Sequence, residues 1–406
     1  MLDLVREILQ TLSHNKLRTA LTGIAVAWGI FMLIVLLGAS RGLYNATQRN
    51  NGVEQSSYAS VWGGWTGKAH KGYKEGRLIR LKDADLEPVM KDGGPHIERA
   101  DATMSVDTAR VSTQKEYITG GIYGAGPNAE VQDRVKMKHG RFINDRDMAE
   151  HRKVVVLQAD QARLLFGDEA QAVGKRVDCM GLSWVVVGVY ENEWRRTTYA
   201  PFNTVMMLTG NKGNIDEMQV KLKGMENEQD VQDVNAALRG VLSQRHDLAE
   251  DDQGAVHVWN RFENYIAQGV ANRVLNAVVW IIGLLTLLSG IVGVSNIMFV
   301  SVRERTHEIG IRRAIGAKPR SILVQVLAES VAITAIFGYI GVFMGIVVTE
   351  ILDKTVGQTD FLYNPRVDIG VAVQVTVVLV LVGALAGFFP AKKATKVKPV
   401  EALRDE

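Results

Sequence analysis

Residue types that can catalyse reactions occur throughout the 406 residues, but their spacing matches none of the motifs that would use them. A Walker A loop requires G-x-x-x-x-G-K-[ST], so that backbone amides and a lysine can hold phosphates. The stretch from Gly167 to Lys175 has the wrong spacing, and Lys68 is followed by Ala69 rather than by Ser or Thr. No G-x-S-x-G element occurs either. We therefore predict that the chain is not an enzyme and binds no cofactor.

Metal-ligand spacing is also missing. His307-Glu308 lacks the second histidine of a zinc-protease helix, and no cysteine or histidine cluster has ligand spacing. The single cysteine, Cys179, rules out an intramolecular disulfide and is expected to be a small buried apolar residue. No metal site is predicted.

One short segment combines charges and apolar residues in a way that suits protein contact. Arg305, Arg312 and Arg313 offer charge complementarity together with Glu304 and Glu308, and Ile309 and Ile311 offer apolar anchors. The alternative is a basic loop without a partner. Basic charge alone can fix membrane orientation, whereas this mixed pattern exceeds that requirement, so we favour docking.

Four stretches without charge flank this segment and the large region before it. They cover residues 19–40, 274–302, 330–349 and 369–391, each at or beyond the roughly 20 apolar residues that a helix needs to cross hydrocarbon. Backbone amides in lipid must be satisfied within the segment, so these stretches are predicted to be membrane-spanning helices. The first could instead be a secretory signal, but it is too long for one and Arg41 follows it directly.

Basic residues place three regions on one side of the membrane. They gather before the first stretch, between the second and third, and after the fourth, whereas the link at 350–368 holds more acids than bases. By the positive-inside rule both termini are cytoplasmic and residues from about 42 to 272 lie outside. Glu329, the one acid at the edge of a stretch, is expected in the headgroup region or facing the bundle.

These boundaries divide the chain into consecutive segments. The membrane helices are predicted at 19–41, 273–302, 321–349 and 369–391. The other predicted segments are a cytoplasmic amphipathic helix at 1–18, an outer domain at 42–272, a cytoplasmic coupling loop at 303–320, a short outer loop at 350–368, and a cytoplasmic tail at 392–406.

Small residues recur four positions apart within the predicted spans. Such spacing lets helix backbones approach closely, although Gly is also simply common in membrane helices, and the pattern alone leaves both explanations open. The candidate packing residues are Gly341, Gly345, Gly383 and Gly387, with Ala25 and Gly29 in the first span.

The outer domain alternates strand-like and helix-like patterns, so the predicted class is a membrane protein with four transmembrane α-helices and a large α+β domain between the first and second. We expect strands at 152–157 and 184–189, a short helix at 159–166 stopped by Gly167, a helix capped by Asp83, and a longer one at 227–245. The aromatic, glycine-rich segment 58–73 is expected to pack at a domain edge, with a substrate-binding role as the alternative.

The stretch from about 260 to 302 lacks proline and predicts one continuous helix about 60 Å long. That is about twice the thickness of the hydrocarbon layer. A rigid stalk of this length would join a cytoplasmic loop to the outer domain and act as a lever.

The loop Val302-Arg-Glu-Arg-Thr-His-Glu-Ile-Gly-Ile-Arg-Arg-Ala-Ile-Gly-Ala317 closely resembles the corresponding loop of the MacB/FtsX family of ABC-transporter permeases. The ending around Pro390-Ala-Lys-Lys-Ala394 and 399–404, and the entry Asn15-Lys16-x-Arg18-Thr19, also resemble that family. Further resemblance to its periplasmic domain lies at 140–142, 154–157, 165–167, 173–175 and 186–189.

The resemblance implies a dimer of permeases, homomeric or heteromeric, in a bacterial inner membrane, each with a periplasmic domain of two subdomains, the inserted one at about 115–220. It implies a cytoplasmic ABC ATPase as a separate subunit that binds ATP and magnesium, and movement transmitted through the stalks to the periplasmic domains. By this analogy the ATPase docks on the coupling loop, whose expected contact residues are Glu304, Arg305, Thr306, Glu308, Ile309, Ile311, Arg312, Arg313 and Lys318.

Export in a tripartite efflux system, with a periplasmic adaptor and an outer-membrane duct, is the leading functional hypothesis. The alternatives are an FtsX-like regulator of cell-wall enzymes and a permease that extracts lipoproteins from the membrane. The expected surroundings are membrane lipid and protein partners, without nucleic acid.

Overall fold

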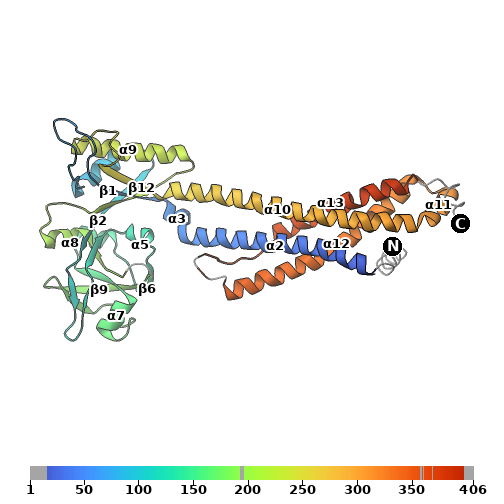
Figure 1. The fold of residues 1–406 in the computed structure, drawn as a ribbon. Helices are drawn as coiled ribbons and strands as arrows, with labels where there is room; N and C mark the ends of the chain where they lie inside the picture. Colours follow the sequence, from blue (N-terminus) through green and yellow to red (C-terminus); the bar gives the residue numbers. More distant parts are fainter. Residues whose placement is uncertain (1–15, 193–195, 357–358, 360, 368, 397–406) are drawn as a thin grey trace. The chain divides into compact units, whose positions relative to one another are not determined.

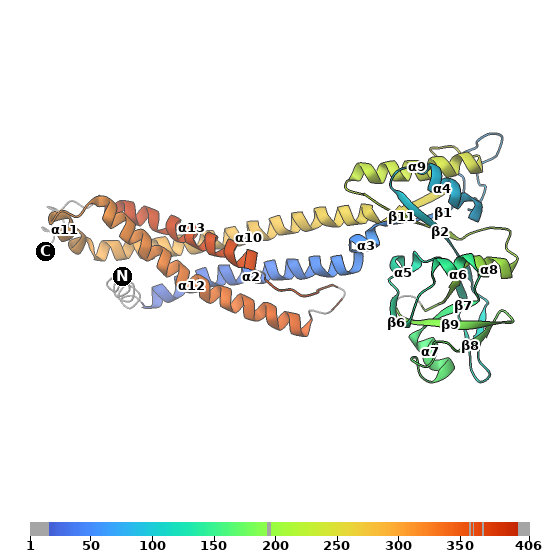
Figure 2. The ribbon, with the colours of Figure 1, turned by 180° about the vertical axis from the view of Figure 1, so that it is seen from behind.

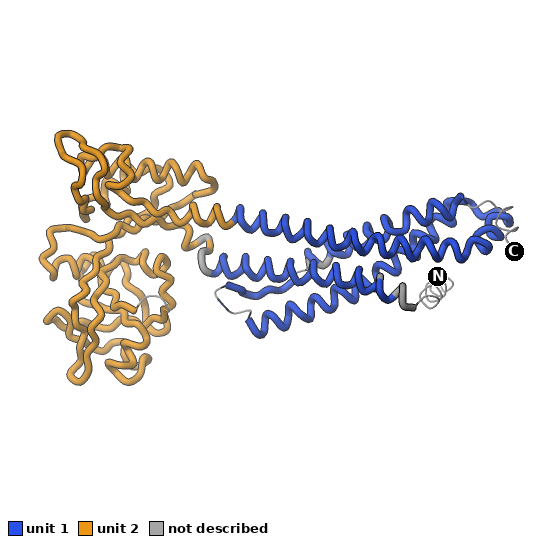
Figure 3. The backbone as a smooth tube through the Cα atoms, in the orientation of Figure 1, with its two compact units in different colours: residues 1–50, 269–406 blue, residues 51–268 orange. Residues whose placement is uncertain are grey.

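Residues 1–50 and 269–406 form one unit of the computed structural model, and residues 51–268 form another (Figure 3). The structure describes residues 16–192, 196–356, 359, 361–367 and 369–396. The amphipathic helix predicted at 1–18 lies almost entirely outside the described residues, as does the end of the predicted tail. We call the first unit the helical unit and the second the periplasmic unit, after the outer location that the charge pattern of the sequence predicts for it.

The helical unit is built from long helices whose sequences are apolar for the length of a membrane (Figure 1). Four helices of the described chain are long and apolar enough to span a bilayer. They and the short helix between the second and third are α2 (Lys16–Asn51), α10 (Arg261–Glu304), α11 (Thr306–Ala314), α12 (Pro319–Thr355) and α13 (Ile369–Ala394).

All four spanning helices extend beyond the predicted spans, α13 only by three residues at its end. α2 continues to Asn51, α12 runs from Pro319 to Thr355, and α10 begins at Arg261, in the periplasmic unit, and continues without a break to Glu304. Helices this long need neither end at the membrane surface nor be straight, because once nucleated a helix continues until a breaking residue or a competing contact stops it.

Close approaches between α2, α12 and α13 depend on glycine. A Cβ atom on Gly341 would lie 2.3 Å from the carbonyl oxygen of Ala27 in α2, and one on Gly345 would lie 2.6 Å from Ile34. A Cβ on Gly383 would lie 2.8 Å from the backbone of Val331. Gly387 is similarly close to Ser330, at 2.6 Å. These separations allow no side chain, which gives each of the four predicted glycines a packing reason.

The periplasmic unit contains one mixed sheet (Figure 2). Its strand order is β12-β1-β11-β2-β5-β10-β7-β9-β8-β3-β4, with β6 paired to β9. The strands are β1 (Tyr58–Gly63), β2 (Ile97–Val106), β3 (Arg110–Ser112), β4 (Tyr117–Thr119), β5 (Ile122–Ala125), β6 (Lys136–Gly140), β7 (Val154–Gln158), β8 (Arg176–Cys179), β9 (Leu182–Glu191), β10 (Thr198–Pro201), β11 (Glu217–Leu222) and β12 (Val256–Asn260).

Strand β2 joins two halves of this sheet. It pairs with β11 through residues 97–103 and with β5 through residues 104–106. The first half consists of β12, β1, β11 and the start of β2, and the second half holds the strands from β3 to β10. The helices of the unit are α3 (Val53–Ser56), the 3₁₀ helix η1 (Asp83–Asp85), α4 (Leu86–Asp92), α5 (Ala129–Gln132), α6 (Asp145–Ala149), α7 (Ala159–Phe166), α8 (Phe202–Thr209) and α9 (Glu228–His246).

Several local predictions are confirmed. Helix α7 occupies residues 159–166 and ends at Gly167, whose φ of +82° is unfavourable for other residues. Helix α9 begins after Asn227, whose side chain accepts a hydrogen bond from the amide of Asp230. β7 is buried along its whole length and pairs in parallel with β9, which explains the unbroken apolar pattern in its sequence. Cys179 is fully buried, as expected.

The predicted capping role of Asp83 is wrong. Lys82 occupies the N-cap position before η1, and its backbone amide donates to the carboxylate of Asp85, at 2.8 Å. Asp85 is the more important acid because it is 1% exposed and also accepts hydrogen bonds from Arg245 and His246 of α9, both at 2.7 Å. Asp85 thereby ties η1 and α4 to the end of α9.

The first prediction concerns Gly341. Gly341→Ala would place a methyl group against the Ala27 carbonyl, so we expect a loss of about 1–3 kcal/mol in unfolding free energy from overpacking. The matched control is Gly269→Ala in α10, where nothing lies within 4 Å, and which should be neutral or slightly stabilising. The measurement is thermal unfolding of both purified variants in detergent. Equal unfolding temperatures would contradict close α2–α12 packing.

The second prediction concerns acid stability. Burial by itself raises the pKa of Asp85, but hydrogen bonds from His246, Arg245 and the Lys82 amide outweigh it and lower the pKa to about 2. The stability from this carboxylate is therefore present above the unfolded-state pKa of about 3.9 and is lost as the pH falls toward 2. Asp85→Asn should lower the unfolding temperature at pH 7. On acidification its unfolding temperature should fall by less than that of the wild type.

The control for the acid series is Asp92→Asn, which changes an exposed carboxylate in the same region, at the end of α4. It should follow the wild-type curve from pH 7 to pH 3, recorded by tryptophan fluorescence. Parallel curves for Asp85→Asn and the wild type would show that the Asp85 carboxylate contributes no pH-dependent stability.

Candidate functional site

Helix α11 is set between two spans by short, well-defined turns. Arg305 is the only residue between α10 and α11, and its amide donates to the carbonyl of Ser301, so the chain turns without losing hydrogen bonds. After α11, Gly316 adopts a φ of +104° and the Ala317 amide donates to the Arg312 carbonyl. Pro319 then starts α12 at a position where its missing amide hydrogen costs nothing.

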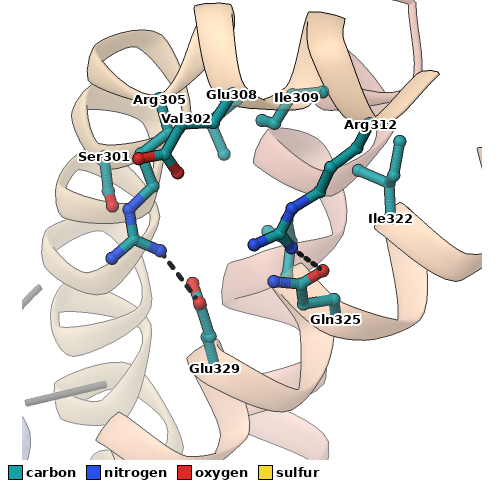
Figure 4. A pocket seen from close by; sticks show the side chains of 10 residues that line it. Ser301, Val302, Arg305, Glu308, Ile309, Arg312, Ile322, Gln325 and Glu329 are labelled. Atoms are coloured by element: carbon teal, nitrogen blue, oxygen red, sulfur yellow. Dashed lines mark hydrogen bonds and ion pairs between the residues drawn. The ribbon is translucent and has the colours of Figure 1, made fainter. Parts of the chain in front are cut away.

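The inward side of α11 is attached to α12 by charge (Figure 4). Arg305 donates through Nη1 to the Glu329 carboxylate, at 3.1 Å, and the Glu329 side chain is 5% exposed. Arg312 donates to the amide oxygen of Gln325, also at 3.1 Å. A buried carboxylate this deep requires a cationic partner, so Glu329 fixes the position of Arg305 and with it the start of α11.

A small pocket of about 30 Å³ lies between α11 and α12, close to the size of one water molecule. Figure 4 shows the side chains of Arg305, Glu308 and Arg312 from the α11 segment on one side and Gln325 and Glu329 from α12 on the other. The pocket is too small for a substrate, and its polar lining suits a bridging water.

A further attachment joins α11 to the end of α13. Arg313 donates to the backbone carbonyl of Thr395, at 2.9 Å, just past the last turn of α13, where unpaired carbonyl groups attract a cation. Lys393 lies 4.0 Å from the ring centre of Phe299 in α10. α11 is therefore joined to two helices besides the one it follows.

The outward side of α11 is exposed and partly apolar. Ile315 is 82% exposed and Ile311 is 39% exposed, four residues apart and thus on one face. Ile309, the other predicted anchor, is half-buried and packs against the core of the helical unit. The exposed predicted residues are Glu304, Glu308, Ile311, Arg312 and Lys318, whereas Arg305, Thr306, Ile309 and Arg313 are half-buried.

Two features of this site, Ile315 and the Arg305–Glu329 pair, were not predicted from the sequence. Ile315 was not selected, although its spacing from Ile311 places both on one helical face. The pairing of Glu329 with Arg305 was also not foreseen; a lone acid at the edge of an apolar stretch was its only signal. The hydroxyl of Thr306 donates to the carbonyl groups of Val302 and Arg303 in the preceding turn, so Thr306 stabilises the end of α10.

The periplasmic unit contains the aromatic segment singled out in the sequence. Tyr58 is buried, but Trp65 is 63% exposed and Tyr73 is 48% exposed, so edge packing accounts for only part of it. The Arg77 guanidinium lies 4.2 Å from the ring centre of Tyr73 and donates to the carbonyls of His246 and Asp247.

Within the described part of the chain, no three His, Cys, Asp or Glu side chains are grouped to hold a metal ion.

Comparison with known proteins gives two family matches that together span most of the chain. Residues 19–241 match the MacB-like periplasmic core domain, and residues 280–399 match the FtsX-like permease C-terminal region. The first match covers α2 and most of the unit between α2 and α10.

Among similar curated proteins are two described as macrolide export ATP-binding/permease protein MacB. The one from Chlorobaculum tepidum is 28% identical over 100% of this chain and 62% of its own length, and the one from Bdellovibrio bacteriovorus is 26% identical over the same shares. The chain thus spans about three fifths of the length of these relatives. The solved periplasmic region of MacB from Actinobacillus actinomycetemcomitans aligns with 55% of this chain and 96% of its own, at 22% identity and a TM-score of 0.43.

The third prediction tests the Arg305–Glu329 pair. Glu329→Leu leaves Arg305 beside a buried apolar side chain, and since Arg305 keeps 22% of its side chain exposed, we expect a moderate loss of about 1–3 kcal/mol. The double variant Arg305→Leu/Glu329→Leu should recover part of the loss, because no unpaired charge remains. Unfolding in detergent is measured for the double variant and for each single variant, Glu329→Leu and Arg305→Leu. A double variant whose loss equals the sum of the single losses would show that the two side chains do not interact.

Proposed function

Because the chain belongs to the family defined by the MacB-like periplasmic core domain, we propose that it transmits ATP-driven movement of a partner ATPase to its periplasmic unit. It is a multi-pass membrane protein with a periplasmic domain and an FtsX-like permease region. The protein is a MacB-like ABC-transporter permease. ATP and magnesium would be bound by the partner ATPase, on the cytoplasmic side, where both chain termini would also lie.

The observation that supports this proposal most is the two-sidedness of α11. Its outward face presents Ile311 and Ile315 among exposed charges, which suits a protein contact with an apolar centre and a polar rim. It is joined to α12 by Arg312 and by Arg305, the residue before it, and to the end of α13 by Arg313. A force applied to the outward face would therefore displace three helices of the unit together.

The expected assembly is a dimer of permeases. The apolar windows of α10 and α12 are only 28% buried within the chain, against 56% for α2, so α10 and α12 offer the most surface to lipid or to a second copy. α10 is also the helix that passes uninterrupted from the periplasmic unit to the residue before the α11 turn. Its continuity supports it as the transmitting element.

We propose export as the physiological role, because the similar curated relatives are described as macrolide export proteins. In this model a periplasmic adaptor and an outer-membrane duct complete the system. The substrate does not pass through the helix bundle, and the periplasmic unit acts on it outside the membrane.

The fourth prediction tests the docking face. Ile315→Glu and Ile311→Glu place a charge at the centre of the proposed contact, and Glu308→Arg reverses a charge beside it. Each should reduce recovery of an ATP-binding subunit with the tagged protein by tenfold or more, which corresponds to about 1.4 kcal/mol. The measurement is affinity purification in mild detergent, with mass spectrometry and an ATPase assay.

The control for this experiment is Arg320→Glu, which reverses an exposed charge in the first turn of α12, outside α11. It should retain the partner. If the wild type recovers no ATPase subunit under several detergents, the transmission model is wrong and a membrane-anchored sensor explains the chain better. A co-purified periplasmic adaptor would support export, whereas a cell-wall enzyme would favour the regulator.

A further inference from the structure

A single arginine joins the start of α10 to the short helix α5. Arg261 is the first residue of α10, and its Nη1 donates to the carbonyl of Gln132, the last residue of α5, at 2.7 Å. Its guanidinium lies 5.2 Å from the ring centre of Trp259. Burial lowers the pKa of Arg261, while the nearby carboxylates of Asp133 and Glu217 act in the opposite direction. The side chain is thus largely removed from water and directed at α5.

Helix α5 lies on one face of the first half of the sheet through polar contacts. Gln132 donates from Nε2 to the hydroxyl of Ser60 in β1, at 2.8 Å, and to the Glu217 carboxylate in β11, at 3.2 Å. The backbone amide of Asn128 donates to the carboxylate of Asp101 in β2, at 3.2 Å. Ser60 and Asp101 are register partners of the same residue, Gln219, so all three side chains share this face.

This contact leaves several buried polar atoms without a protein partner. They are both amide atoms of Gln219, Oε1 of Gln132, Nδ2 of Asn128 and Nε of Arg261. The Gln219, Gln132 and Asn128 residues are 1%, 2% and 6% exposed. Each such atom would cost about 1–3 kcal/mol if left unsatisfied, so these groups suit bridging by water. Where water bridges two polar surfaces, a small displacement of α5 against the sheet can replace one hydrogen bond with another at low cost.

The other face of the same junction is apolar. Met104 of β2 lies three residues after Asp101 and therefore faces the opposite side. It is buried with Phe202 and Val205 of α8, and a Cβ on Gly124 would touch both Met104 and Val205 at 3.2 Å. Parting these side chains would expose apolar surface, at about 25 cal/mol per Å². The α8 side resists opening through apolar contacts, whereas the polar groups of the α5 side can replace a hydrogen-bond partner with water.

We propose that Arg261 is a positioning residue that makes α5 follow the first turn of α10, so that the second half of the sheet pivots about the α8 contact when α10 moves. The inference rests on the proposed function, because it assumes that α10 transmits movement. The movement enters the second half of the sheet at the hydrogen bond between Arg261 and the carbonyl of Gln132.

The test measures a distance within the periplasmic unit. Spin labels are placed at Gln232→Cys in α9 and Leu164→Cys in α7, both exposed positions on different halves of the sheet. The native Cys179 is fully buried and burial raises its pKa to about 12, so it does not react with the label. The complex with its co-purified ATPase is compared without nucleotide and with ATP and vanadate by double electron–electron resonance.

We expect the distance in the otherwise wild-type complex to shift with nucleotide and the shift to be lost in Arg261→Met, with ATP hydrolysis within about twofold of wild type. Arg261→Lys should restore part of the shift, since its amine can still donate to the Gln132 carbonyl. Gln132→Leu cuts the bonds to Ser60 and Glu217 but keeps that carbonyl, so its shift should persist. The matched control is Arg273→Met, an exposed arginine further along α10.

The outcomes separate this inference from the proposed function. No shift in the wild type, despite ATP hydrolysis, overturns transmission itself. A shift that survives in Arg261→Met, or is lost equally in Gln132→Leu, overturns the role of Arg261 alone. If Arg261→Met fails to fold, amide hydrogen exchange of residues 126–135 is measured in the wild type with and without nucleotide. If the label distance shifts with nucleotide while this exchange stays the same, Arg261 does not couple α5 to α10.

Discussion

The arrangement of the helical unit depends on one constraint: a carboxylate removed from water must be paired. Glu329 is 3% exposed within α12, and Arg305 supplies its partner from the turn between α10 and α11. Removing the two charges from water costs desolvation energy, which offsets part of their attraction. The pair also constrains position, because α11 must start where Arg305 can reach the Glu329 carboxylate.

The glycines of the spans complement this polar constraint. Gly341 and Gly383 bring the backbones of α2, α12 and α13 into contact distance, and Ser330 donates to the Gly383 carbonyl, at 2.8 Å. Lipid offers no hydrophobic force between helices, so close contact and such hydrogen bonds must hold them together. Close packing of this kind opposes sliding of the helices past one another, which suits the proposed transmission of force from α11.

The sequence predicted those features that depend on local pattern. The four spans, the continuous helix from Arg261, α7 with its glycine stop, and the helix α9 all follow from length, periodicity and stop signals, whereas the Asn227 cap of α9 became evident only in the structure. Features that depend on distant contacts were not predictable: Glu329 finds Arg305 only in the folded chain, and Ile309 turns inward while Ile315 remains exposed. The Asp83 cap failed because the neighbouring Asp85 had stronger partners in α9.

The pairing of β1 with both β12 and β11 has a consequence for biosynthesis. β1 is the first strand of the periplasmic unit to leave the ribosome, yet both of its neighbours are the last two strands to be made. Until they arrive, β1 has two open edges in an unfinished sheet, a state prone to pairing with other chains. The second half of the sheet, whose strands are contiguous in sequence, can form meanwhile. Completion of the sheet must therefore wait for β12, the strand that leads directly into α10.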